Sequence, residues 1–107
     1  MLCPVHNQRM QPVRFKNATI LCCQRDGCDW QCNLNATSTP HDEELRQLRK
    51  RCHEVFDPLV LTRRWESRNA AYRWLRTLLG LPKDRAHFGM LNKDQCRKVL
   101  AALGDKQ

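Results

Sequence analysis

The chain has 107 residues, a net charge of +8 and seven cysteines. This length suits one domain, or one small domain with an attached module, and no apolar stretch is long enough to span a membrane. The first residues lack the apolar segment of a secretory signal, so we expect a reducing, cytoplasmic location. In that compartment, clustered cysteines predict metal binding rather than disulfides.

The basic charge points to the class of partner. Lysine and arginine outnumber aspartate and glutamate by 19 to 11, and the excess is spread along the chain. Such a balance favours a polyanion, either nucleic acid (DNA or RNA) or an acidic protein surface. The densest basic stretch, RQLRKR at residues 46–51, fits an ordinary solvated helix face equally well. Composition therefore leaves both interpretations open.

Residues 1–33 have the pattern of a β-hairpin framed by turns. They combine prolines, Gly27 and short β-prone runs such as VRF and ATIL, and they hold too few apolar residues for an ordinary core. Residues 34–40 are polar and end in Pro40, which predicts a linker. A small N-terminal module followed by a linker is the expected organisation.

The first predicted helix follows this linker. Thr39 and Pro40 are suited to the cap and first helical position, and apolar residues then recur at spacings of three and four from Leu45. The pair Asp57-Pro58 is expected to end the helix. The same spacing puts Arg46, Arg49 and Lys50 together on one side of the helix, at the edge of its buried face or in solvent.

Two further amphipathic helices are predicted by their capping residues. Ser67 precedes one, which Gly80 should end, and Asn92 precedes the other. The apolar stripes predict a three-helix bundle over residues 41–107, with its centre at Trp74, Leu75, Leu78, Val99 and Leu100. The fold class is therefore predicted as α+β, with a zinc-knuckle or ribbon-like β-hairpin before a small helical domain.

Two cysteine motifs flank the predicted hairpin: CPVH at residues 3–6 and LCCQRDGCDWQC at residues 21–32. Two short turns of this kind typically place four side chains around one structural Zn²⁺. We predict the ligands Cys3, His6, Cys23 and Cys28, with Gly27 allowing the second turn. Cys22 and Cys32 stay open as replacements for Cys23 or His6. Four protein ligands leave no place for a catalytic water, so no enzyme is predicted.

Three stretches beyond the cysteines, ELRQLRKRCHEVFDPLV, SRNAAYRWLRTLLGLP and HFGMLNKDQCRKVL, carry a resemblance. They resemble the helical signatures of the small zinc-finger-containing domain family of unknown function, found mainly in bacteriophage, prophage and mobile-element genomes. Its members carry a cysteine knuckle pair, then AH..FDPL, AYRWLA..LGI and CHIGMFD...C. The family usually begins with Cys-x₂-Cys, where this chain has Cys3-x₂-His6, and has a shorter second knuckle. The resemblance implies a phage or prophage accessory protein.

The predicted function is nucleic-acid binding through phosphate contacts. The residues expected to make contact are Arg14, Lys16, Arg25, Arg46, Arg49, Lys50, Arg51 and Trp65. The alternative is a protein-interaction module, a phage inhibitor or adaptor that docks on an acidic host protein of a nucleic-acid-processing or defence complex in the bacterial cytoplasm. Neither hypothesis requires a membrane or a small-molecule substrate.

Overall fold

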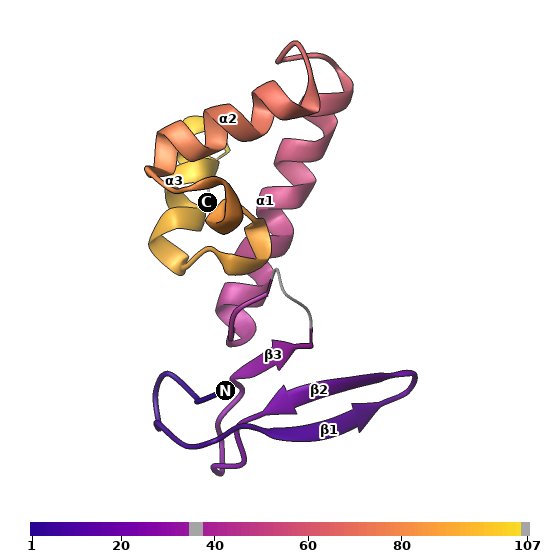
Figure 1. The fold of residues 1–107 in the computed structure, drawn as a ribbon, viewed down its shortest axis with the longest axis vertical. Coiled ribbons are helices and arrows are strands. Elements are labelled where there is room, and N and C mark those ends of the chain that lie inside the picture. Colours follow the sequence, from indigo (N-terminus) through magenta and orange to yellow (C-terminus); the bar gives the residue numbers. More distant parts are fainter. Residues whose placement is uncertain (35–37, 106–107) are drawn as a thin grey trace.

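The structure is a computed structural model that describes residues 1–34 and 38–105. A three-stranded antiparallel sheet precedes three helices, so the predicted α+β class is confirmed. The elements are β1 (Gln11–Phe15), β2 (Ala18–Cys22), β3 (Gln31–Asn33), α1 (Glu43–Leu61), α2 (Arg68–Leu79) and α3 (Lys93–Ala102), with 3₁₀ turns η1 (Lys83–Arg85) and η2 (Phe88–Met90) between α2 and α3. The molecule is elongated, 44 × 26 × 25 Å, with the sheet at one end and the helices at the other (Figure 1).

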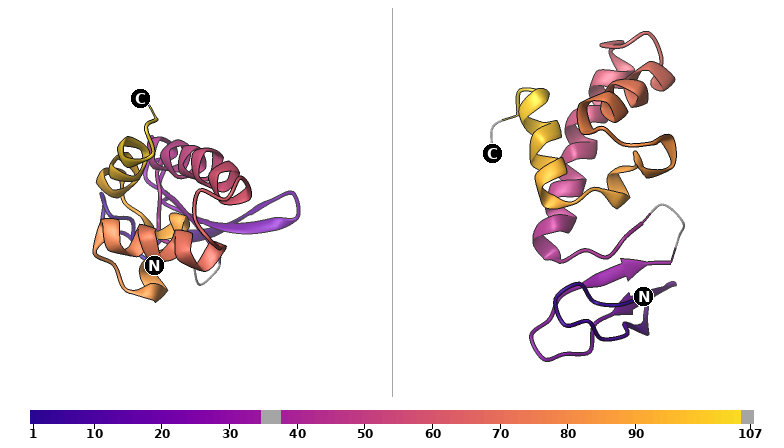
Figure 2. Two further views of the ribbon diagram at one scale, coloured as in Figure 1. Left: turned by 90° about the horizontal axis from the view of Figure 1, so that it is seen from above. Right: turned by 60° about the vertical axis from the view of Figure 1, so that its left-hand side comes forward.

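The sheet contains the predicted hairpin and one strand that the sequence did not predict. β1 and β2 pair so that Phe15 lies opposite Ala18, which leaves a turn of two residues at the hairpin end. Lys16 in this turn has a left-handed φ of 49°. β3 then pairs with β2, with Cys32 opposite Leu21. The third strand returns the chain to the helical end of the molecule (Figure 2).

Both predicted ends of the first helix are wrong. α1 begins after Asp42, whose carboxylate accepts a hydrogen bond from the Leu45 amide at 2.8 Å, and not at Thr39. Thr39 instead donates its amide to the Gly89 carbonyl at 2.9 Å. At the other end, Pro58 lies inside α1, which continues to Leu61. A proline removes one helical hydrogen bond, and the following turn is retained because Val60 packs against the core.

The predicted caps of the other two helices are confirmed. Ser67 accepts a hydrogen bond from the Ala70 amide at 3.1 Å, and α2 ends at Gly80 in a left-handed conformation with φ 64°. Asn92 and Gln95 form a reciprocal capping box at the start of α3. These signals act within a few residues, so the local sequence determines them.

The core of the helical end is formed by ten buried residues from α1, α2, α3 and the η2 region. They are Leu45, Cys52, Phe56, Ala71, Leu75, Phe88, Leu91, Cys96, Val99 and Leu100. Of the predicted centre, Leu75, Val99 and Leu100 are fully buried, whereas Trp74 and Leu78 are only partly buried at its edge. The described part of the chain contains no helix long and apolar enough to cross a membrane.

Arg49 is buried, contrary to the prediction that it lies at the edge of the buried face or in solvent. Its side chain is 8% exposed and points inward from α1. Nε donates to the Leu91 carbonyl at 3.0 Å, and the two terminal nitrogens donate to the Thr39 carbonyl at 3.0 Å and the Thr39 hydroxyl at 2.8 Å. The guanidinium therefore joins the chain before α1 to the chain before α3.

Further hydrogen bonds connect the sheet to α1. Gln31 of β3 and His41 exchange two backbone hydrogen bonds, each of 2.7 Å. The Asp29 carboxylate accepts from the Glu43 amide at 2.9 Å. The predicted linker, residues 34–40, lies between β3 and these contacts, and its residues 35–37 fall outside the described part of the chain.

We predict that Arg49→Met lowers the free energy of unfolding by about 3 kcal/mol, because it leaves the buried Leu91 carbonyl and the partly buried Thr39 carbonyl without this donor. Urea denaturation of the zinc-loaded protein measures this. The neighbouring Lys50→Met removes an exposed cation from the same helix and should change stability by less than about 0.5 kcal/mol. Equal losses in the two variants would contradict the role given to Arg49.

Candidate metal centre

The first pair of candidate ligands lies in a tight turn before β1. The Asn7 amide donates to the Cys3 carbonyl at 2.8 Å and the Cys3 amide to the Gln8 carbonyl at 2.9 Å. Asn7 adopts a left-handed φ of 53°, a conformation that asparagine tolerates better than most residues. This turn points the side chains of Cys3 and His6 in the same direction.

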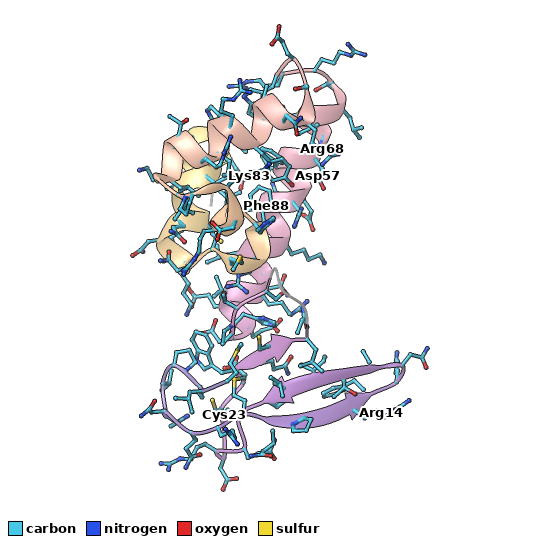
Figure 3. The ribbon with its side chains drawn as sticks, viewed as in Figure 1. Arg14, Cys23, Asp57, Arg68, Lys83 and Phe88 are labelled. Atoms are coloured by element: carbon cyan, nitrogen blue, oxygen red, sulfur yellow. The ribbon has the colours of Figure 1, made fainter. Side chains whose placement is uncertain are left out.

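The second pair lies in the segment between β2 and β3. Cys23 follows directly after β2, and its amide donates to the Trp30 carbonyl at 3.1 Å. The turn is closed by a 3.1 Å hydrogen bond from the Cys28 amide to the Arg25 carbonyl, and Gly27 adopts a left-handed φ of 77°. Figure 3 shows Cys23 at the end of the sheet.

The four side chains meet at one point with the dimensions of a zinc site. Their ligand atoms all lie within 4.8 Å of one another. The Cys3 and Cys28 sulfurs are 3.7 Å apart, and His6 Nδ1 lies 3.7 Å from the Cys3 sulfur and 3.6 Å from the Cys23 sulfur. Tetrahedral Zn²⁺ with ordinary bond lengths requires edges of about 3.8 Å between sulfurs and about 3.6 Å between sulfur and nitrogen. The arrangement fits that ion.

The same distances exclude a disulfide at this point. A disulfide requires a sulfur–sulfur distance of about 2.0 Å, against 3.7 Å between Cys3 and Cys28. None of the seven cysteines forms a disulfide. Metal coordination is therefore what this cluster of sulfur and nitrogen atoms can do.

The surroundings favour the ligand form of Cys3. Burial alone would raise the pKa of this thiol, but hydrogen bonds from the backbone at His6 and Val5 outweigh it and lower the pKa to about 7. At Cys28, a hydrogen bond from the backbone at Trp30 lowers the pKa, but burial and the neighbouring Cys23 and Cys3 outweigh it and raise the pKa to about 11. Crowded thiolates repel one another until a cation neutralises them, so binding Zn²⁺ releases protons here.

The two alternative ligands point elsewhere. Cys22 lies on β2, where successive side chains face opposite sides, and its sulfur contacts the Ile20 carbonyl at 3.9 Å. Cys32 is 1% exposed, and its sulfur lies 3.4 Å from the Asn33 carbonyl and 3.9 Å from that of Ser38. Cys32 packs beside Cys3, Met10 and Cys23 as a small apolar side chain.

Comparison with known families agrees with this geometry. The model of a family described as a zinc-finger-containing domain, DUF3268, matches residues 6–106. The chain belongs to this family. The matched segment includes His6, Cys23 and Cys28, while Cys3 lies just before it. No curated protein and no solved structure gives a significant match.

This zinc-finger-containing domain holds one structural Zn²⁺. Two ligands come from the turn before β1 and two from the segment between β2 and β3, so the ion joins the chain that enters the hairpin to the chain that leaves it. Four protein ligands complete a tetrahedron, the arrangement of structural sites, whereas catalytic sites keep one position for water or substrate.

The residues predicted to contact a partner lie in different surroundings. Arg14, Lys16 and Arg25 are exposed around the sheet. On α1, Arg46 pairs with Glu43 at 2.8 Å, Arg51 with Asp105 at 2.6 Å, and Lys50 lies 4.0 Å from Glu54. Trp65 is partly buried, with its ring 5.3 Å from that of Phe56 and 5.1 Å from that of Trp74. The structure thus separates the cations around the sheet from those of α1.

Sequence reasoning passed over the cations of α2 and η1. Arg68, Arg73, Arg76 and Lys83 border one hollow on the helical end of the molecule. The helical period offered a signal, because Arg68, Tyr72 and Arg76 recur every four residues of α2.

We predict that Cys28→Ser weakens zinc binding by about 100-fold or more, because substitutions of residues that only hydrogen-bond to metal ligands already lower metal affinity by about 10–100-fold. Cys22→Ser and Cys32→Ser should keep one zinc per chain, since both sulfurs face backbone carbonyls. Zinc content after dialysis against a competing chelator distinguishes them. Comparable zinc loss from Cys28→Ser and Cys22→Ser would show that the second pair is assigned incorrectly.

Complete removal of zinc should unfold the sheet and leave most of the helical signal. The ten core residues of the helical end all lie between Leu45 and Leu100, and a large buried apolar side chain contributes about 2 kcal/mol. The buried residues of the sheet are Cys3, Met10, Cys23 and Cys32. Far-ultraviolet circular dichroism before and after chelation provides the measurement. Loss of all helical signal in one step would instead mean that both parts unfold together.

Proposed function

We propose that this zinc-finger-containing domain binds nucleic acid through its phosphates, with the zinc ion serving only to fold the N-terminal part. We place it among the accessory proteins of bacteriophages and prophages, on the strength of the motifs it shares with proteins of such genomes. The role includes no catalysis, because the four protein ligands fill the coordination sphere of the zinc.

The observation that carries this proposal is the distribution of cations without an acidic partner. Among the eighteen described lysines and arginines, five form ion pairs and Arg49 is buried. The other twelve are exposed or partly buried, without a described ion pair: Arg9, Arg14, Lys16, Arg25, Arg63, Arg64, Arg68, Arg73, Arg76, Lys83, Arg85 and Lys98. A surface of uncompensated cations releases counterions from nucleic acid on binding, which drives association.

The end of the β1–β2 hairpin supports the same function. Phe15 is 48% exposed and stands between Arg14 and Lys16 in the sequence. An exposed aromatic ring flanked by cations can stack on a base while its neighbours contact phosphates. Figure 3 shows Arg14 on this hairpin, which extends away from the metal centre. The left-handed φ of Lys16, 49°, places a cation at a turn position that glycine or asparagine usually takes.

A second candidate function is docking on a host protein. Several large apolar side chains of the N-terminal part are exposed: Met1 55%, Leu2 51%, Val5 64% and Leu34 59%. Apolar surface of this kind is typical of protein interfaces. Under this alternative, the cations would match an acidic partner surface instead of phosphates. Dependence on salt separates the two, since apolar contacts are less sensitive to salt than phosphate contacts.

We predict that the protein retards labelled DNA or RNA in a gel shift at low salt, with affinity that falls steeply as salt rises. The double variant Arg14→Glu/Lys16→Glu should weaken binding to every sequence and reduce the salt slope by about 0.7–0.9 per lost phosphate contact. Lys98→Glu on α3 is the control, since it makes one such charge reversal at an exposed site away from the hairpin.

No retardation at low salt would overturn the nucleic-acid function and favour docking on a protein. An equal loss of binding free energy per reversed charge in Lys98→Glu and in the hairpin variant would mean that net charge, and not the hairpin, determines binding. Zinc content and circular dichroism of each variant verify that its fold is retained.

A further inference from the structure

The helical end of the molecule carries a cationic hollow that the zinc centre does not explain. It measures about 570 Å³ and lies between α2 and the segment that contains η1. Its lining residues are Arg68, Asn69, Tyr72, Arg73, Arg76, Lys83, Ala86 and His87. Small-ligand sites usually measure about 300–1,000 Å³, so the hollow has room for a ligand group of several atoms. In Figure 3, Arg68 and Lys83 both lie at the helical end, far from Cys23.

The charge of this hollow is one-sided. Four of its lining residues are cations, and none of the lining residues is a carboxylate. The ion pairs of the described residues lie on other parts of the surface and involve none of these four cations. Asn69, Tyr72 and His87 add further hydrogen-bonding groups. Arginine side chains match the oxygens of a phosphate in geometry as well as in charge, so phosphate is the group this hollow fits best.

A smaller hollow of about 270 Å³ adjoins it. Ser38, His53, Tyr72, His87, Phe88 and Gly89 form its lining, and two of these, Tyr72 and His87, also line the larger hollow. The rings available at this hollow are those of His53, which is exposed, and of Tyr72 and His87, which are partly buried. The Phe88 ring is buried and lies edge-on to His53, with centroids 4.7 Å apart. Aromatic and imidazole rings beside a phosphate site provide the surface on which a nucleic-acid base stacks.

We propose that these two adjoining hollows form a binding site for single-stranded nucleic acid, with a phosphate in the larger hollow and an unstacked base at the smaller one. This proposal rests on the proposed function and adds the form of nucleic acid that is bound. In a duplex the bases are paired inside the helix, so only the phosphates reach a pocket on the protein. A single strand can turn one base out of its stack.

The charges beyond the hollow favour a strand over an isolated nucleotide. Arg63 and Arg64 precede α2, and Arg85 lies in η1, so uncompensated cations continue on either side of the lining residues in the chain. A single nucleotide would use only the cations in the hollow, whereas a strand can place successive phosphates along the whole group. The observed pattern therefore points to a polymer.

The test is fluorescence anisotropy of the zinc-loaded full chain with a labelled oligothymidylate and with the duplex of the same length. We expect the single strand to bind more tightly than the duplex. The double variant Arg73→Glu/Lys83→Glu changes two exposed lining cations and should weaken single-strand binding by about tenfold, with a salt slope reduced by about 0.7 per lost contact. Lys98→Glu, with the same fold and zinc content, should bind almost as the unmodified protein does.

Competition experiments identify the chemistry. Thymidine monophosphate should displace the labelled strand at a lower concentration than inorganic phosphate, because only the nucleotide has a base for the smaller hollow. Equal displacement by the two would overturn the role of that hollow. If polyglutamate displaces the labelled strand as effectively as the unlabelled strand does, phosphate recognition is overturned and an acidic protein partner is indicated.

The remaining outcomes separate this inference from the proposed function. If the duplex binds as tightly as the single strand, or if Arg73→Glu/Lys83→Glu has no effect while Arg14→Glu/Lys16→Glu weakens binding, the inference is wrong and nucleic-acid binding stands. If the unmodified protein binds no single-stranded DNA, no duplex DNA and no RNA, both the inference and the proposed function are wrong.

Discussion

The N-terminal third of this molecule depends on the coordination of one zinc ion. Its buried residues amount to Cys3, Met10, Cys23 and Cys32, which is too little apolar surface to order more than thirty residues. Coordination supplies what burial cannot, because it ties the turn before β1 to the segment after β2. The hairpin, and with it the exposed Arg14 and Lys16, is oriented by that connection. The positions of these cations in space are therefore a consequence of the metal site.

Local features of this fold could be predicted from the sequence, and features that need distant partners could not. The spacing of Cys3 and His6, the capping side chains Ser67 and Asn92, and the left-handed Gly80 act over a few residues. β3 was missed because its three residues become a strand only by pairing with β2. The start of α1 was misplaced since Thr39, a good cap by sequence, is held by Gly89 and Arg49, which lie fifty and ten residues away.

Net charge indicates a class of partner but not the surface that would contact it. The basic stretch of residues 46–51 looked strongest in the sequence, yet its charge is largely compensated in the fold. Some of that compensation comes from far along the chain, as when Arg51 meets Asp105. The α2 cations are less clustered in the sequence. Their charge is not compensated, because no acidic side chain lines the hollow they share. Tertiary contacts, more than the density of basic residues, decide which cations are available to a partner.

The hydrogen bond from the Glu43 amide to Asp29 has a consequence for the evolution and engineering of such proteins. Asp29 directly follows a zinc ligand, Cys28, and it completes the first turn of a helix that belongs to the other part of the molecule. The zinc-binding part thus supplies an acceptor for one amide of the first turn of α1. A foreign zinc finger grafted before residue 41 would leave that amide without its acceptor. Chimeras would have to exchange the knuckle together with the first turn of α1. A segment exchanged between such proteins would therefore have to extend past the linker and include the first turn of α1.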